Sequence, residues 1–194
     1  MEIVKPKIKL LNITPEPLKL IEMAGRICYK SEEKIEEGSD EKFVKMIIDR
    51  GHESVLEHAS ATYLIITDRG VTHELVRHRI ASYSQESTRY CNYSKIGIKF
   101  IKPDFDLDEE DLQFLSLCEG HYTNKIKKGF SPQQARYFLP GGLKTEIIVT
   151  MNFRGWRHFL KLRTQKAAHP QIRQIALMIL ENLKGNVPVV FNDI

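Results

Sequence analysis

The sequence predicts one compact domain, spanning residues 1–194, in which helices and strands are mixed. Its length suffices for one sizeable hydrophobic core and is short for two ordinary domains. Hydrophobic residues make up 42% and charged residues 28% of the chain, which is the balance of a soluble globular protein. Both strand-like and helix-like patterns occur along the chain, and together they predict the mixed class.

The first part of the chain contains two predicted strands separated by two predicted helices. Residues 2–13 alternate loosely between apolar and polar side chains, which predicts an opening strand. A helix is expected over about 16–30, and a shorter one follows a charged connection at 31–40 and ends at Gly51. Residues 59–67 are rich in β-branched and aromatic side chains, which favour a strand.

The remaining predicted elements follow a turn expected at 68–70. In order, they are a helix at 71–80, a strand at 98–101, a helix at 104–128, a helical turn at 131–137, a strand at 144–152, and helices at 153–165 and 171–184. Acidic residues begin the 104–128 helix and lysines end it, as the helix dipole favours. Ser131 and Pro132 are residue types typical of an N-cap and a first helical position.

Charge and cysteine content narrow the classes of function. A net charge of +4 favours anionic ligands but is too low for a dedicated nucleic-acid arm, so no nucleic-acid partner is expected. Cys28, Cys91 and Cys118 are widely spaced without a CxxC pair, which indicates neither a disulfide framework nor a zinc site and fits a reducing cytoplasm. There is no export signal and no run of about 20 apolar residues, so we expect a soluble protein without a membrane span.

Residues 77–90 predict a cradle for an anionic ligand. Arg77, His78 and Arg79 put three potential cations in a row on the expected helix, so at least one of them should point inward. Hydroxyl and amide side chains follow, and Arg89 adds a planar guanidinium suited to phosphate. The alternative is a basic helix end followed by a polar surface loop.

Residues 51–58 contain two histidines and two carboxylates, which raises the question of a metal. A zinc-binding helix needs its histidines one turn apart, whereas His52 and His58 are six residues apart. Metal ligation is therefore disfavoured, and no metal site is expected. A helix end with a charged turn is the structural alternative.

Residues 152–163 predict a cation on a buried helix face. Phe153, Trp156 and Leu160 form one apolar stripe, and Arg163 continues it. Burying a guanidinium is costly, so Arg163 should have an acidic partner or an anionic ligand. Alternatively, it emerges where the helix ends and interacts with the helix dipole.

Arg136 is a lone arginine in an apolar patch and would by itself be a surface residue.

These segments resemble the motifs of the flavin-dependent thymidylate synthases, and the resemblance spans about 45–180. Arg77, His78, Arg79 and Ser87 match the family signature of Arg-His-Arg followed by seven residues and serine. Residues 51–58 resemble the GHxSxxEH element, residues 135–140 resemble ARxxLP, and 152–154 match N-x-R. Two positions depart from the family pattern, because Glu74 stands where many members carry glutamine and His158 where asparagine is common.

The resemblance implies a set of ligand residues. Those implied for FAD are Ser54, Arg77, His78, Arg79, Gln85, Asn152, Arg154 and His158. Those implied for dUMP are Glu74, Arg77, Gln85, Glu86, Ser87, Thr88, Arg89, Arg136 and Arg163. Arg163 is the implied catalytic residue, which would stabilise the N3-deprotonated pyrimidine as a fixed cation, and His52 would lie near the reacting centre. Ser87 is expected to be a ligand because the sequence shows no adjacent base that would make it a nucleophile.

The resemblance also implies a fold and an activity. The implied fold is an α+β domain with a central, mostly antiparallel sheet flanked by helices, assembled as a homotetramer with active sites shared between subunits. The implied activity is methylation of dUMP to dTMP, with 5,10-methylenetetrahydrofolate as carbon donor and FAD, reduced by NADPH, as hydride carrier. Gly-x-Gly-x-x-Gly is absent, so a Rossmann-type flavin site is not expected. A non-catalytic nucleotide- or RNA-binding module and a metal-dependent hydrolase are the alternatives.

Overall fold

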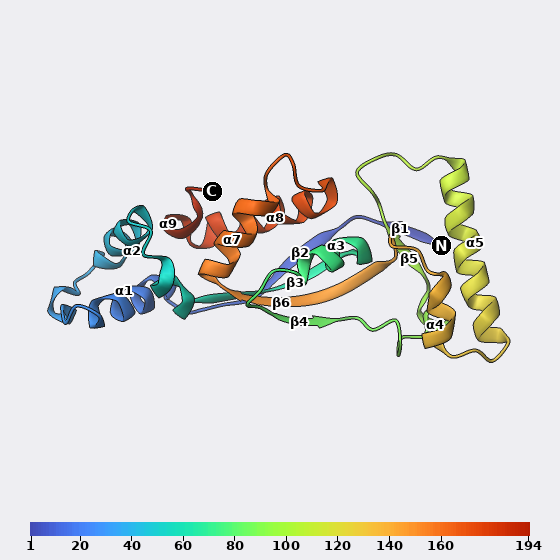
Figure 1. The fold of residues 1–194 in the computed structure, drawn as a ribbon, viewed down its shortest axis with the longest axis horizontal. Helices are drawn as coiled ribbons and strands as arrows, with labels where there is room; N and C mark the ends of the chain where they lie inside the picture. The colour runs from blue at the N-terminus through green and yellow to red at the C-terminus, as the bar shows by residue number, and fades with distance from the viewer. The chain divides into compact units, whose positions relative to one another are not determined.

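The computed structural model describes residues 1–194, which fold into two compact units (Figure 1). Unit 1 comprises Met1–Lys7, Ile65–Arg77 and Ser84–Ile147, and unit 2 comprises Ile8–Leu64, His78–Tyr83 and Ile148–Ile194. Each unit is assembled from three separate stretches, so the chain passes repeatedly from one unit to the other.

The strands form a four-stranded antiparallel sheet and a parallel pair. Their bounds are β1 Glu2–Val4, β2 Lys7–Ile13, β3 Ser60–Asp68, β4 Ser82–Gln85, β5 Lys99–Ile101 and β6 Lys144–Asn152. The larger sheet has the order β2-β3-β6-β4, and its antiparallel character together with the helices confirms the predicted α+β class. In the pair, β1 lies parallel to β5 with Ile3 opposite Phe100.

Unit 2 contains the helices that follow β2 and β6, with η marking 3-10 helices. They are α1 Pro17–Ile27, η1 Glu32–Lys34, α2 Ser39–Asp49, η2 Glu53–His58, α7 Phe153–Arg163, α8 Pro170–Asn186 and α9 Pro188–Phe191. The predicted stripe of Phe153, Trp156 and Leu160 is fully buried on α7. The Trp156 indole donates to the Ala61 carbonyl at 3.0 Å and lies edge-on to Tyr63, with ring centroids 5.3 Å apart. The apolar face of α7 is therefore anchored on β3.

Unit 1 contains the long helix and several short ones. They are α3 Arg69–Leu75, α4 Tyr93–Ile96, α5 Glu109–Lys127, α6 Pro132–Ala135 and η3 Arg136–Phe138. Its apolar core consists of Tyr93, Ile98, Phe100, Tyr122, Ala135 and Leu143. α5 begins at Glu109 rather than at the expected 104. The reason is a capping box, in which the Asp108 carboxylate accepts from the Asp111 backbone N–H at 2.9 Å and the Asp111 carboxylate accepts in return.

Two strands lie at or within one residue of the bounds that their strand-like residues predict. β6 covers the expected 144–152, and β3 is shifted by one residue from the expected 59–67. The single opening strand expected over 2–13 is wrong, because Lys5 and Pro6 separate β1 from β2. Proline lacks the N–H that a continuous strand pairing needs, and β1 pairs with β5 instead.

The expected turn at 68–70 is wrong, and the expected helix at 71–80 is displaced. The Asp68 carboxylate accepts from the Val71 backbone N–H at 2.8 Å, so Asp68 caps a helix that begins at Arg69. This helix ends at Leu75, which leaves the Arg-His-Arg tripeptide beyond it. β4 and α9 were not predicted. No helix in the structure has the length and apolar character of a bilayer span.

Candidate active site

The predicted ligand residues divide between the two units. Unit 2 holds His52, Ser54, His78, Arg79, Asn152, Arg154, His158 and Arg163, and unit 1 holds Glu74, Arg77, Gln85, Glu86, Ser87, Thr88, Arg89 and Arg136. Most residues expected to bind FAD thus lie in unit 2, and most residues expected to bind dUMP lie in unit 1.

Unit 2 contains a cavity of about 970 Å³. Its walls come from α1, α2, the segment that begins η2, and α7, and they include His52, Ser54 and Arg154. Phe43 and Met46 of α2 add apolar surface. This volume is at the upper end of ordinary ligand pockets, and the mixture of cations with apolar side chains suits a large anionic ligand that carries rings. The contribution of α1 and α2 was not foreseen from the sequence.

A buried carboxylate fixes the two helices that form one wall of this cavity. Glu22 of α1 is buried and accepts from the Arg26 guanidinium, Nε at 2.8 Å, and from the Ser39 hydroxyl at 2.8 Å. Gly25 leaves room for the Phe43 ring, because a Cβ at this glycine would lie 2.6 Å from ring atoms. α1 and α2 are therefore held together by a satisfied polar contact and by close packing, and they lie side by side in Figure 1.

His78 and Arg163 form the central contact between two predicted motifs. The Arg163 Nε donates to the His78 Nε2 at 2.9 Å, across 85 residues of sequence. His78 also lies edge-on to Phe159, with ring centroids 4.9 Å apart, and its carbonyl accepts from the Tyr83 hydroxyl at 2.6 Å. His78 is therefore the inward-packing member of its tripeptide, whereas Arg77 and Arg79 are exposed. Tyr83 was not among the expected site residues.

The imidazole of His78 is neutral in the folded protein. Burial, reinforced by the charges of Arg163 and His158, lowers the pKa of His78 from 6.5 to about 4. A neutral Nε2 can accept the Arg163 hydrogen bond, which a protonated ring could not do. The sequence predicted an acidic partner or an anionic ligand for Arg163. In the structure, the neutral His78 imidazole is one partner of the Arg163 guanidinium and helps to orient it.

In unit 1, the side chains of Gln85 and Glu86 are held by neighbouring strands and helices. The Gln85 amide donates to the hydroxyls of Thr72, at 2.9 Å, and Thr145, at 3.3 Å. The Glu86 carboxylate accepts from the Tyr93 hydroxyl at 2.8 Å, and from Lys144 Nζ and the Glu146 backbone N–H. These contacts fix the orientation of both side chains, and burial raises the pKa of Tyr93, so its hydroxyl stays a donor.

Two segments of unit 1 that carry expected dUMP ligands lie against each other. The buried Thr88 hydroxyl accepts from Arg136 Nη1 at 3.1 Å. Arg89 Nε donates to the Gln133 side-chain oxygen at 3.1 Å, and the Arg89 backbone N–H donates to the Ser87 hydroxyl at 3.3 Å. These contacts bring together Ser87, Thr88, Arg89 and Arg136. Glu74 lies half-buried on α3 of the same unit.

Two residues with implied FAD roles already have partners in the protein. Asn152 is the N-cap of α7, and its side-chain oxygen accepts from the Gly155 backbone N–H at 2.8 Å. Arg154 donates to the Glu57 carboxylate at 2.6 Å, an exposed ion pair on the cavity side of α7.

Glu53 and Glu57 pair with arginines, and no group of three or more metal-ligating side chains is positioned to hold a metal ion. The hydrolase alternative therefore gains no support.

Comparison with solved structures identifies the fold. The chain superposes on a UMP/dUMP methylase from Streptomyces cacaoi, solved with 5-Br dUMP, with a TM-score of 0.82 and 23% identity over 99% of this chain and 96% of that one. It also superposes on thymidylate synthase X from Helicobacter pylori, solved with FAD and dUMP, with a TM-score of 0.81 and 24% identity over 97% of this chain and 98% of that one. The fold is thus the α+β fold of these enzymes.

Sequence comparison makes the assignment specific. The family model described as thymidylate synthase complementing protein matches residues 9–189. The flavin-dependent thymidylate synthase of Geobacter sulfurreducens is 38% identical over 96% of this chain and 86% of its own length. That of Pyrococcus furiosus is 38% identical over 91% of this chain and 78% of its own length. The chain belongs to the flavin-dependent thymidylate synthase family.

Proposed function

We propose that the chain methylates dUMP to dTMP, with 5,10-methylenetetrahydrofolate as carbon donor and FAD, reduced by NADPH, as hydride carrier. The observation that carries the proposal is the hydrogen bond between His78 and Arg163 in a member of this family. This hydrogen bond connects His78, the middle residue of the Arg-His-Arg signature, to Arg163, which the family resemblance implies for the pyrimidine ring. The two residues are far apart in sequence.

The cavity of unit 2 fits FAD. Its volume of about 970 Å³ accommodates a ligand larger than ordinary metabolites, and Arg154 and the neighbouring Arg50 offer cations for a diphosphate. Phe43 and Met46 provide apolar surface for ring systems. Ser54 lies at the same wall with an exposed hydroxyl that can donate or accept. When bound, FAD would supply the hydride, while the chain's own residues bind and orient the reactants.

The nucleotide would be held chiefly by unit 1. Arg89 and Arg136 can supply fork-shaped donors to a phosphate, and the Ser87 hydroxyl lies beside them. The orientation of Arg136 is set by its contact with Thr88, and Gln85 and Glu86 are fixed by the contacts described above. Preorganised donors of this kind lose little conformational entropy when the ligand binds.

Arg163 would act as the electrostatic catalyst. Its guanidinium is oriented by a hydrogen bond to the neutral His78 ring, which brings no negative charge of its own. A fixed cation at N3 favours the deprotonated ring and places charge stabilisation where negative charge develops. His158 lies edge-on to His78, with ring centroids 6.2 Å apart, and so belongs to the same group of side chains.

We extend the proposal to assembly and location. The two units would work as one domain, and four copies would form a homotetramer with active sites shared between subunits. The family to which the chain belongs supports this proposal. Cys28, Cys91 and Cys118 are free thiols, which supports function in the reducing cytoplasm.

The absorption spectrum of the purified protein tests this function against its alternatives. We expect the protein, as purified or after incubation with FAD, to retain a yellow chromophore through gel filtration. A protein that retains no flavin, but shifts RNA or carries a stoichiometric metal ion, would contradict the proposal and favour one of the two alternatives.

A further inference from the structure

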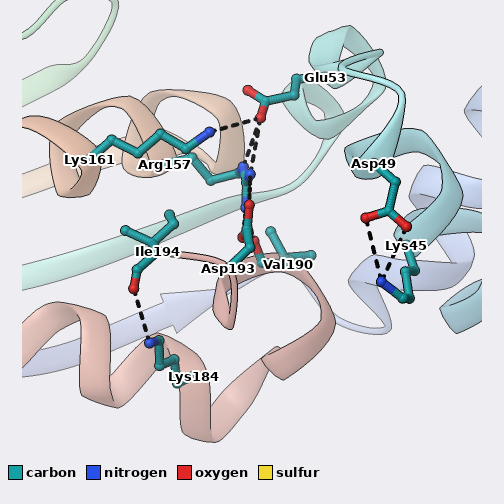
Figure 2. Close-up of polar contacts among 9 residues, drawn as sticks. All are labelled: Lys45, Asp49, Glu53, Arg157, Lys161, Lys184, Val190, Asp193 and Ile194. Carbon is teal, nitrogen blue, oxygen red and sulfur yellow. Dashed lines mark hydrogen bonds and ion pairs between the residues drawn. The ribbon is translucent and has the colours of Figure 1, made fainter.

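Arg157 is a charged residue of unit 2 whose side chain is buried and which has no role in a predicted motif. Its side chain is 1% exposed, although it lies on α7 between the exposed Arg154 and Lys161. Its two terminal nitrogens face both carboxylate oxygens of Asp193 at 2.6 and 2.7 Å, and Nη1 also donates to the Val190 carbonyl. Figure 2 shows these contacts converging on one guanidinium.

The other side of the Arg157 guanidinium faces the cavity wall. Nε donates to Glu53 Oε1 at 3.1 Å, and Nη2 lies 3.0 Å from the same oxygen. Lys161 Nζ reaches this oxygen as well, at 3.3 Å (Figure 2). Arg157 and Lys161 therefore form one charge-balanced cluster with Glu53 and Asp193. Each guanidinium nitrogen of Arg157 has an acceptor in this cluster.

The contacts within the cluster shift the pKa values of Arg157 and Asp193. Burial alone would lower the pKa of Arg157, but the contacts with Asp193 and Glu53 outweigh burial and raise it. The Arg157 hydrogen bonds likewise hold the pKa of Asp193 below its usual range. Both shifts favour the charged forms of Arg157 and Asp193.

Glu53 connects this cluster to the cavity. It lies between His52 and Ser54 in sequence, and all three residues line the cavity. Glu53 begins η2, a 3-10 helix, whose hydrogen-bond geometry is poorer than that of an α-helix, and His52 is its N-cap. The other ion pair between η2 and α7, Glu57 with Arg154, is about half exposed and adds little rigidity. The contact between Glu53 and Arg157 is therefore the most buried ion pair between η2 and α7.

We infer that Glu53 and Arg157 are positioning residues for the flavin: they hold the His52–Ser54 segment at the distance from α7 that the bound cofactor requires. Asp193 secures Arg157 from the opposite side. This inference rests on the proposed function, because it assumes that the cavity takes FAD.

The test compares FAD affinity in three variants of the full chain at 25 °C. Glu53→Gln keeps the size of the side chain but removes its charge. Asp193→Asn weakens the cluster from outside the cavity. Asp49→Asn is the matched control, since Asp49 forms an exposed ion pair with Lys45 at 3.1 Å and does not line the cavity (Figure 2). FAD dissociation constants come from flavin fluorescence titration, and thermal melting and the visible circular dichroism of bound FAD are recorded in parallel.

We expect Glu53→Gln to weaken FAD binding about tenfold or more and to change the visible circular dichroism, as the removal of residues that orient direct ligands generally does. Asp193→Asn should weaken binding in the same direction by a smaller factor, and Asp49→Asn should match the wild type. A merely structural role would lower the melting temperature and leave the FAD affinity and spectrum of the folded protein unchanged.

The outcomes separate this inference from the function on which it rests. A wild type that binds no FAD would overturn the proposed function and this inference with it. A wild type that binds FAD, with Glu53→Gln equal to it in affinity and spectrum, would overturn the inference alone. If Glu53→Gln does not fold, Asp193→Asn decides, and an unchanged FAD affinity in that variant overturns the inference.

Discussion

The folded protein should lose stability through His78 as the pH falls from 6.5 toward 4. The folded state holds this imidazole neutral because burial and the charges of Arg163 and His158 lower its pKa to about 4, whereas the unfolded chain protonates it near 6.5. Between these values the unfolded state binds more protons than the folded state, so stability increases with pH. The His78 contribution is complete above pH 6.5 and is lost by pH 4.

The magnitude follows from the gap between the two pKa values. A gap from 6.5 to about 4 corresponds to about 3 kcal/mol between the two protonation states. Because His78 is only partly buried, solvent screening reduces the expected contribution to about 1–2 kcal/mol. Protonation would also remove the acceptor for the Arg163 Nε.

The assay is urea unfolding of the wild type and of His78→Gln at several pH values from about 7.5 to 4.5. Glutamine keeps an acceptor for Arg163 but does not titrate in this range. The wild type should lose about 1–2 kcal/mol more than the variant over the series. His73→Gln, which removes an exposed histidine of α3, is the control and should follow the wild type. Parallel stability curves for the wild type and His78→Gln would refute the reasoning.

Three further substitutions probe the site and its support. Arg163→Ala should abolish dTMP formation while FAD stays largely bound, as read by product chromatography and flavin absorbance; near-normal turnover would remove Arg163 from its role. Thr88→Val removes the hydroxyl that accepts from Arg136, so it should raise the KM for dUMP about three- to tenfold without changing FAD affinity. An unchanged KM would show that this contact does not orient Arg136. Trp156→Ala should cost about 3–5 kcal/mol of unfolding free energy in urea titration, because it empties a fully buried site and removes the indole N–H that donates to the Ala61 carbonyl. A loss below about 1 kcal/mol would contradict the assigned core.

Elements with one buried face could be predicted from the sequence alone. β6 was predicted with its observed bounds from its strand-like residues, and in the structure its odd and even residues differ in burial along the whole strand. β4 lacks such a signal, because Ser82–Gln85 is polar and becomes a strand only through its place beside β6. The helix expected to reach Ile80 ends at Leu75 because His78 packs against Phe159 and Arg163, which local propensity does not register.

Sequence motifs indicated the candidate ligand residues, but they did not indicate the residues, distant in sequence, that hold those ligands in place. Arg163 and the signature around His78 were identified from their spacing. Arg157 also carried a signal, since it lies four residues after Phe153 on the buried face of α7, where a charged residue needs a partner. Its partners Glu53 and Asp193 lie 104 and 36 residues away, and no local pattern connects them. The cavity wall formed by α1 and α2 depends on equally distant packing.

Product formation from the complete set of reactants tests the central claim most directly. The purified protein is incubated with dUMP, 5,10-methylenetetrahydrofolate, FAD and NADPH, and dTMP is quantified by chromatography with each reactant omitted in turn. We predict dTMP in the complete mixture and its loss when FAD is removed. Absence of dTMP from protein that has bound both FAD and dUMP, or undiminished dTMP without FAD, would contradict the account.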